Sequence, residues 1–554
     1  MTPPASPVDR GRLAALHAEE EQRFVDLHPT SARLAAEAGE HLLAGVPMPW
    51  MTRWPGSFPL FVETAGGGRF TDVDGITYVD LCLGDTGSMT GHCLPAVAEA
   101  VRERTERGIT TMLPSTDAAW VAAELSRRFG LPRWQMAMTA TDANRFVLRF
   151  ARHLTGRPRI AVMDWCYHGT VDETLGVLEH GRAGDRVVAR PGALGPQVDV
   201  ATTTAVVPFN DLEALDARLA EGGVACLLME PALTNIGIVL PDDGYLAGVR
   251  EITRRHGVLL VNDETHTICA GPGGATAAWG LEPDLVVIGK PIGGGIPVAA
   301  YGMTEDVAAR LEGPMLGHDI DVAGVGGTLS GSALAMAAVR ATLSTALRQE
   351  DFDVSIPLAE SFTAGIQGVI DEHDLPWHVQ RLGCRAEYWF CPPPRTGAEA
   401  AAAVDEELDA FFHLWTVNRG VLLAPAGEWF LAMLVLPLAV VVIFSFGERG
   451  PAGGYVPAFT FEQYANLPAR WTAFRNTLTL APVGTLLALL IAYPLAYFLA
   501  IRTDPKWRTL LLILVIVPFW TSILIRSYAW IFILGGQGIP SLLALVGLEN
   551  VRLI

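Results

Sequence analysis

The chain has 554 residues, a formal net charge of −19 and a mean hydropathy of +0.31, so it is long enough for several domains and rich in apolar residues. Residues 1–427 hold 32 Lys and Arg against 54 Asp and Glu, and residues 428–554 hold 8 against 5. The acidic N-terminal part argues against a nucleic-acid partner, because phosphate backbones are bound by clustered cations. Seven cysteines without a C-x-x-C pair argue against zinc and a disulfide framework, so we expect no metal and a reducing compartment.

Up to about residue 427, apolar runs alternate with amphipathic stretches, which is typical of an α/β domain with a largely parallel sheet. The predicted strands are 159–163, 204–207, 225–229, 258–262 and 285–288, with predicted helices at 211–221 and 245–256 between them. The alanine- and acid-rich segment 397–409 is predicted to be a solvated helix face. Residues 1–25 contain no apolar segment of the signal-peptide type.

Two segments early in this domain could bind a phosphorylated, ring-shaped cofactor. Residues 139–143 open a helical stretch, where the backbone N–H groups of Ala140 and Thr141 are free to bind a phosphate. Tyr167 and His168 follow the strand 159–163, and Tyr167 could stack on the ring. Each signal is weak by itself, since Tyr167 could equally be a core residue.

Lys290 is the most informative residue, because it and Lys506 are the only lysines in the chain. It follows the apolar run 285–288 and precedes the glycines 293–295. Arginine cannot replace lysine in forming a Schiff base with an aldehyde or ketone, so we predict covalent amine chemistry at Lys290. Asp263 ends another strand twenty-seven residues earlier and could hold the proton of a pyridinium ring, although it could also cap the next helix.

Two further positions are candidates on the C-terminal side of Lys290. The small-residue turn 326–331 carries Thr328, whose hydroxyl suits a phosphate. Arg385 could clamp a substrate carboxylate, or it could be an ordinary surface arginine.

Together these stretches resemble the class III (subgroup II) pyridoxal-phosphate aminotransferases of fold type I, close to glutamate-1-semialdehyde aminomutase and its relatives. The resemblance covers about residues 25–425 and is carried by 70–75, 91–92, 167–169, 230–235, 263–264, 289–297 and 327–331. It implies a large domain with a mainly parallel seven-stranded sheet and a smaller α/β domain. The expected division is an N-terminal segment 1–75, a cofactor-binding domain 76–325 and a truncated small domain 326–427.

The resemblance also implies a role for each candidate residue. Lys290 would bond to pyridoxal 5'-phosphate and move the substrate proton, and Asp263 would pair with the ring nitrogen. Tyr167 would stack on the ring. The remaining residues would complete the site: the backbone of Ala140 and Thr141 at the phosphate, His168 beside the cofactor, Glu230 and Asn235 near the ring hydroxyl, and Thr328 from the neighbouring subunit of a homodimer.

The sequence departs from the family pattern at two places. Ala140 stands where the family usually has glycine, but it keeps the backbone N–H that a phosphate needs. After Asp263 and Glu264 the family usually continues with valine and a hydrophobic segment, whereas this chain continues with 265–269, Thr-His-Thr-Ile-Cys. The second departure argues against the aminomutase substrate.

From residue 429 the sequence changes character and predicts three membrane spans, at about 429–446, 476–500 and 509–534. Basic residues in 501–508 predict that this loop and the enzyme domain face the cytoplasm of an inner (plasma) membrane. Residues 429–554 resemble the first part of a spermidine/putrescine-type ABC importer permease. The coupling loop that docks the ATPase is missing, so we expect no ATPase partner.

The combined features favour an aminotransferase that moves an amino group between an amine or amino acid and a keto acid, attached to a partial permease. One alternative is a glutamate-1-semialdehyde 2,1-aminomutase. Another is a polyamine permease subunit that carries an enzyme, or a non-physiological gene fusion.

Overall fold

The computed structural model describes residues 8–181, 184–194, 199–315 and 324–424, and the backbone of 428–430, 448–449 and 455–456. The chain divides into two compact units, Met1–Val440 and Val441–Ile554. In the second unit the described backbone forms one antiparallel pair, β17 (Glu448–Arg449) with β18 (Tyr455–Val456).

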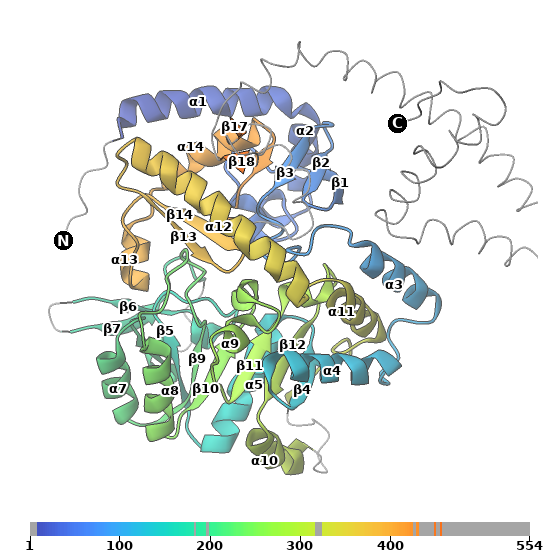
Figure 1. Ribbon diagram of the computed structural model, residues 1–554, viewed down its shortest axis with the longest axis vertical. Helices are drawn as coiled ribbons and strands as arrows, with labels where there is room; N and C mark the ends of the chain where they lie inside the picture. The colour runs from blue at the N-terminus through green and yellow to red at the C-terminus, as the bar shows by residue number, and fades with distance from the viewer. Residues whose placement is uncertain are drawn as a thin grey trace, which may run out of the picture. The chain divides into compact units, whose positions relative to one another are not determined.

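A seven-stranded sheet forms the centre of the first unit (Figure 1). Its strands, in spatial order, are β4 (Arg133–Ala137), β12 (Ala299–Met303), β11 (Leu285–Ile288), β10 (Leu259–Asp263), β9 (Val224–Met229), β5 (Arg159–Met163) and β8 (Thr204–Val207). The five strands from β11 to β8 are parallel, and β12 runs antiparallel to both of its neighbours. The predicted mainly parallel seven-stranded sheet is therefore confirmed.

The predicted strands agree with the observed ones to within one residue, but β4 and β12 were not predicted. The reason is local composition. In β4 (Arg-Trp-Gln-Met-Ala) Arg133 and Gln135 are exposed and only Ala137 is buried, and β12 (Ala-Ala-Tyr-Gly-Met) is rich in small residues with weak strand propensity. Their pairing to each other and to β11 determines that they are strands.

Helices and smaller sheets surround this central sheet. The helices are α1 (Arg10–Leu27), α2 (Pro29–Gly39), α3 (Pro95–Glu106), α4 (Thr116–Phe129), α5 (Ala140–Thr155), α6 (Val200–Thr203), α7 (Leu212–Ala220), α8 (Tyr245–Arg255), α9 (Gly274–Ala278), α10 (Glu305–Met315), α11 (Ala333–Thr345), α12 (Gln349–Glu372), α13 (Gly397–Ala402) and α14 (Glu406–Val417). Short 3-10 turns are η1 (Leu43–Gly45), η2 (Pro49–Thr52), η3 (Asp172–Thr174), η4 (Thr267–Ala270) and η5 (Lys290–Gly293). The predicted helix face 397–409 is divided between α13 and α14.

Three small sheets complete the unit. They are β1 (Val62–Gly66), β2 (Arg69–Asp72), β3 (Thr77–Asp80) and β15 (Val421–Leu422); β6 (Gly176–Glu179) with β7 (Arg186–Ala189); and β13 (His378–Leu382), β14 (Arg385–Trp389) and β16 (Glu428–Phe430). The long helix α12 runs diagonally across the view of Figure 1, next to β13 and β14.

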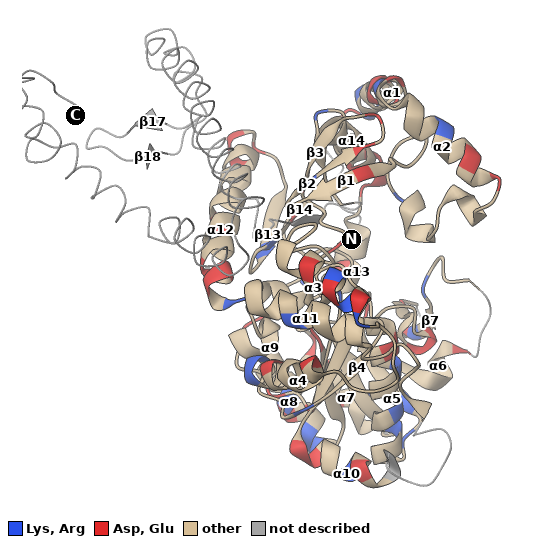
Figure 2. Ribbon diagram, turned by 90° about the vertical axis from the view of Figure 1, so that its right-hand side faces the viewer, with Lys and Arg blue, Asp and Glu red and all other residues tan. Residues whose placement is uncertain are grey.

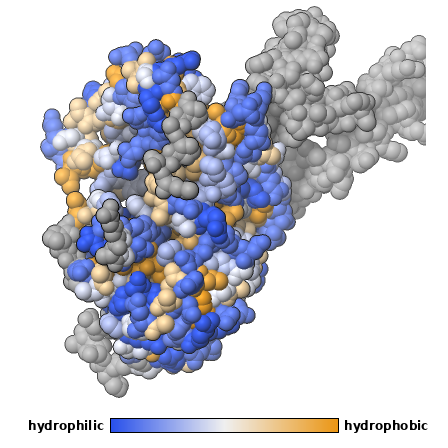
Figure 3. Space-filling view, turned by 90° about the vertical axis from the view of Figure 1, so that its left-hand side faces the viewer, coloured by the Kyte–Doolittle hydropathy of each residue, from blue (hydrophilic) through white to orange (hydrophobic). Residues whose placement is uncertain are grey.

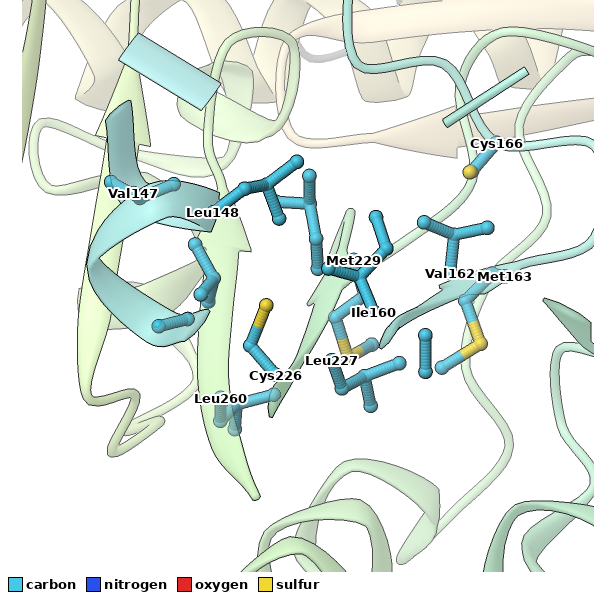
Figure 4. Close-up of a cluster of buried hydrophobic side chains, with 14 of the residues drawn as sticks. Val147, Leu148, Ile160, Val162, Met163, Cys166, Cys226, Leu227, Met229 and Leu260 are labelled. Atoms are coloured by element: carbon cyan, nitrogen blue, oxygen red, sulfur yellow. The ribbon is translucent and has the colours of Figure 1, made fainter. Parts of the chain in front are cut away.

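The main hydrophobic core lies between α5 and the central strands. Figure 4 shows Val147 and Leu148 of α5 beside side chains of β5, β9 and β10, among them Ile160, Leu227 and Leu260. Each large apolar side chain buried in this way contributes about 1.5–3 kcal/mol to folding. The core therefore holds the N-terminus of α5 and the C-terminal ends of the strands in a fixed arrangement.

The surface uses arginine where a cation is needed. Figure 2 shows acidic and basic residues interspersed along α3, where Arg102 pairs with Glu99 at 2.6 Å and with Glu106 at 2.9 Å. The face in Figure 3 is mostly hydrophilic with scattered hydrophobic areas, as expected for a folded domain. Because arginine serves as the surface cation, solubility does not explain why residue 290 is a lysine.

Among the described residues, no helix is long and apolar enough to cross a bilayer. The predicted spans 476–500 and 509–534 lie outside the described residues, and so does most of 429–446. At the start of the first predicted span, Glu428–Phe430 pairs antiparallel with β14 as β16, and the span itself stays a prediction. A strand is formed there because it satisfies the backbone groups on the edge of β14 that β13 leaves unpaired.

Candidate active site

Lys290 lies directly beyond the C-terminal end of β11, at the start of η5. Its φ of +46° is in the left-handed region, an uncommon conformation for a residue with a side chain that is often found at functional sites. Its Nζ contacts the carboxylate of Asp85 and lies 2.8 Å from Nε2 of His266. The strand end and the turn therefore direct the amine into a polar environment.

Asp263 ends β10, the strand beside β11, and is only 3% exposed. Its Oδ2 accepts hydrogen bonds from Asn144 Nδ2 and His168 Nδ1, both at 2.9 Å, and its Oδ1 accepts one from the Thr265 N–H at 3.1 Å. Burial alone would raise the pKa of Asp263, but the contact with His168 and the other donors hold it below the usual value. A carboxylate accepts about four hydrogen bonds, so one acceptor position remains for a donor in the cavity.

His168 is a buried partner of this carboxylate. Burial disfavours its charged form, but Cys166 and Asp263 outweigh that effect and raise the pKa of His168 to about 10. Its Nδ1 contact with Oδ2 of Asp263 is one of the interactions that hold this carboxylate in place. The sequence predicted His168 to lie beside the cofactor. In the structure its ring contacts Asp263, and it is not among the described residues that line the cavity.

Tyr167 lines the cavity, and its backbone N–H donates to Oε1 of Glu230 at 3.2 Å. Burial raises the pKa of its phenol, with the Asp85 carboxylate acting in the same direction, so the ring stays neutral. Glu230 follows β9, is 2% exposed and also accepts from the hydroxyl of Thr234. Burial raises the pKa of Glu230. The observed donors to Glu230 are thus the Tyr167 backbone N–H and the Thr234 hydroxyl.

The N-terminus of α5 forms a cradle beside this group. Thr139 is the N-cap, and its Oγ1 accepts from the Asp142 N–H at 3.2 Å, so the N–H groups of Ala140 and Thr141 remain available to an anion. Gly169 packs so closely that an added Cβ would overlap Oγ1 of Thr141. Thr141 Oγ1 in turn accepts from the Thr170 N–H at 3.2 Å.

These residues surround one cavity of about 420 Å³ at the C-terminal ends of the parallel strands, where α/β proteins bind their ligands. The described residues that line it are Gly87, Ser88, Met138, Thr139, Ala140, Thr141, Tyr167, Gly169, Asp263, Thr265, His266, Lys290, Gly295, Ile296, Pro297 and Val298. The cavity thus joins an amine, a buried carboxylate, an aromatic ring and an anion cradle.

Five predicted residues are not among the described residues that line the cavity: His168, Glu230, Asn235, Thr328 and Arg385. Asn235 lies in the loop that follows Glu230, and Thr328 is exposed in a turn. Arg385 begins β14 and is fully buried. It donates to Glu387 at 2.6 Å, to the carbonyl of Thr234 at 3.1 Å and to Nδ1 of His266 at 2.8 Å. Arg385 therefore lies behind the cavity wall.

Sequence reasoning missed Asp85, His266 and Asn144 as parts of the site. Asp85 is 205 residues from Lys290, and no local pattern marked it. Asn144 is one turn into α5 and is recognisable only once the helix is placed against β10. His266 was visible as a departure from the family pattern, but its contact with Lys290 was not predicted.

The aminotransferase class-III family matches residues 50–436 of the chain. The chain is 33% identical over 377 residues to glutamate-1-semialdehyde 2,1-aminomutase 2 of Exiguobacterium sibiricum, with 67% of this chain and 84% of that protein covered. It is 32% identical over 404 residues to the glutamate-1-semialdehyde 2,1-aminomutase of Anaeromyxobacter dehalogenans, with 72% and 91% covered.

Solved structures give the same result. A glutamate-1-semialdehyde-aminomutase from Pseudomonas aeruginosa PAO1, a lysine-to-alanine variant in complex with PMP, is 47% identical with a TM-score of 0.75, and the match covers 77% of this chain and 95% of that one. An omega-transaminase from Sphaerobacter thermophilus is 27% identical with a TM-score of 0.69, covering 74% and 95%.

Proposed function

The chain belongs to the class-III aminotransferases, and from this premise we propose that it moves amino groups by means of pyridoxal 5'-phosphate bound in the cavity beside Lys290. The observation that carries the proposal is the convergence of Lys290, the buried carboxylate of Asp263 and the cradle of α5 on one cavity. A ring nitrogen, a ring face and a phosphate each have a fitting group there.

Each residue of the site has its own role in the proposed reaction. When bound, the cofactor supplies an aldehyde and an electron-poor ring that accepts negative charge from the substrate carbon. Lys290 provides the amine and can carry a proton to and from that carbon. Asp263 would hold a proton at the ring nitrogen, and the contact with His168 would keep its carboxylate in position. Tyr167 would cover the ring, and the N–H groups of Ala140 and Thr141 would bind the phosphate.

The phosphate cradle gives a direct test. Gly169→Ala should weaken the binding of pyridoxal 5'-phosphate about tenfold or more, because the new Cβ would overlap Thr141 Oγ1 and lie 3.0 Å from its Cα. Gly169 also has a φ of +77°, which itself disfavours alanine. The dissociation constant is measured by titration of the cofactor-free chain.

Gly222→Ala is the matched control, because Gly222 has the same φ of +77° but nothing within 4 Å of the added Cβ. It bears the same backbone strain without the overlap. Equal losses of cofactor affinity in both variants would mean that backbone strain acts alone and that Gly169 does not shape a cradle.

Within this reaction class, we propose that the substrates are an amine or amino acid and a keto acid. The support is the polar segment after Asp263, where Thr265 and His266 line the cavity in place of the valine and hydrophobic residues expected from the family pattern. Residues 429–554 resemble a permease that imports polyamines, and an enzyme attached to such a permease would act on an imported amine. We therefore expect putrescine-like diamines or ω-amino acids as donors, with pyruvate or 2-oxoglutarate as acceptor.

The second candidate is glutamate-1-semialdehyde 2,1-aminomutase, which the names of the similar proteins favour. An aminomutase needs no external acceptor, because one substrate both gives and receives the amino group. Incubation with a panel of amines, with and without keto acids, separates the two. Turnover of glutamate-1-semialdehyde alone, with every amine donor refused, would overturn the aminotransferase proposal.

We propose that the enzyme is a homodimer in which Thr328 reaches the partner's cofactor phosphate. The support is that Thr328 is exposed beside Leu329, which is 46% exposed, and that the apolar side chains of Met112 and Leu113 are more than 70% exposed.

Mixing equal amounts of inactive Thr328→Asp and Lys290→Ala chains should restore about a quarter of the activity, since about half of the dimers are mixed and one of the two sites in each mixed dimer is intact. Proven subunit exchange without recovery would contradict the sharing of Thr328.

We also propose that residues 429–554 attach the enzyme to the cytoplasmic side of the inner membrane. The uncharged runs within 429–534 and the resemblance to a permease support this proposal. The full chain should remain in the membrane fraction after carbonate extraction. Its complete release would contradict the proposal.

A further inference from the structure

Each of the two ring nitrogens of His266 lies close to a nitrogen of a neighbouring side chain. Nε2 lies 2.8 Å from Nζ of Lys290, and Nδ1 lies 2.8 Å from NH1 of Arg385. The hydroxyl of Thr86 is also 2.8 Å from Nδ1, but a hydroxyl either donates or accepts and therefore does not decide the tautomer. Arginine only donates, so Nδ1 must be the accepting nitrogen.

This requirement determines the tautomer of His266. A nitrogen that accepts a hydrogen bond from Arg385 holds no proton, so the ring is neutral, and burial acts in the same direction by lowering the pKa of His266. A neutral imidazole carries one proton. With Nδ1 accepting from Arg385, that proton is on Nε2 and points toward Nζ of Lys290.

An Nε2–H group needs an acceptor, and Nζ accepts only as an uncharged amine with a free lone pair. That amine still has N–H groups to donate to Asp85, so all three contacts are satisfied together. We infer that Arg385 fixes the tautomer of His266 and that the pair acts as positioning residues which favour the uncharged, nucleophilic form of Lys290.

Other charged groups near Lys290 also affect the balance between its charged and uncharged forms. Asp85 favours the charged amine, and its Oδ1 is buried without a hydrogen-bond partner among the described residues, so this carboxylate is the main influence against the uncharged form. Glu387 pairs with Arg385 and is 1% exposed, so the guanidinium acts on His266 mainly through its hydrogen bond. Asp263 and the neutral phenol of Tyr167 also line the cavity.

The inference rests on the proposed function only in taking Lys290 as the reacting amine, and its test needs neither cofactor nor turnover. The cofactor-free full chain is treated with limiting acetic anhydride over a range of pH, and the acetylation of each lysine is measured by peptide mass spectrometry. Because Lys290 and Lys506 are the only lysines, Lys506 is an internal reference in every sample.

His266→Met, which removes both ring nitrogens, should move the midpoint of the Lys290 labelling profile about one unit to higher pH. This corresponds to about tenfold slower labelling at neutral pH, the size expected for the loss of one hydrogen bond. His266→Gln should retain most of the wild-type profile, since its amide N–H can donate from nearly the same position. The Lys506 profile should not move.

Arg385→Met combined with Glu387→Leu removes the buried pair without leaving a lone charge, and it should move the midpoint in the same direction as His266→Met. An unchanged or lowered midpoint in His266→Met or in this double variant would overturn the inference. A fall in labelling rate without a midpoint shift would also overturn it, because it would reflect altered access alone.

A measurement on the unaltered chain tests the inference even if these variants fold poorly. Selective ¹⁵N labelling of histidine gives ring-nitrogen signals that differ between a protonated and an unprotonated nitrogen, and their coupling to the ring protons separates Nδ1 from Nε2. In His266, Nδ1 should be unprotonated and Nε2 protonated at neutral pH. A proton on Nδ1 of His266 would overturn the inference.

Discussion

A Lys290→Arg variant should lose turnover by at least about four orders of magnitude and should form no covalent bond to pyridoxal 5'-phosphate. A guanidinium keeps the positive charge but does not condense with an aldehyde at neutral pH. The variant can still pair with Asp85, so the fold and the charge of the site are preserved. Borohydride treatment followed by mass spectrometry measures the covalent bond, and absorbance measures its spectrum.

Lys506→Arg is the matched control, because it removes the only other lysine. It should bind the cofactor covalently and turn over at the wild-type rate. A borohydride-stable cofactor adduct in Lys290→Arg would place the covalent chemistry at another amine and would contradict the assignment of Lys290.

Much of the fold could be predicted from the sequence because its central strands are short, apolar and buried on both faces. Strands such as Leu285–Ile288 are fully buried, and their composition determines their local structure. The strands Arg133–Ala137 and Ala299–Met303 could not be predicted in this way. They are strands because of their antiparallel pairing with each other and with β11, which is a long-range property.

In the candidate site, too, local sequence features could be predicted and long-range contacts could not. Lys290 and Asp263 could be predicted, since each follows a recognisable strand and has a side chain whose chemistry is distinctive. Their partners could not, because Asp85 and Arg385 come from segments far away in the sequence. Arg385 shows the difference most clearly. As a residue type it suggested a carboxylate clamp, but its burial beside Glu387 gives it a structural contact with His266.

Asp263→Ala should still bind pyridoxal 5'-phosphate but lose turnover by several orders of magnitude. Lys290 and the phosphate cradle are intact in this variant, so binding survives. Turnover falls because no carboxylate holds the proton at the ring nitrogen, and negative charge on the substrate carbon is no longer stabilised. Single-turnover kinetics with a good amine donor, on chain saturated with cofactor, measures the chemical step separately from binding.

Asn144→Ala is the graded comparison, because it removes one of the donors to Asp263 but keeps the carboxylate and its contact with His168. We expect a loss of about tenfold, the effect of one hydrogen bond to a charged group. Removing Asp263 should also lower the pKa of His168 from about 10, because burial then acts without the carboxylate that opposes it. If Asp263→Ala turns over at the rate of Asn144→Ala, another group must hold the ring proton, and the assignment of Asp263 is wrong.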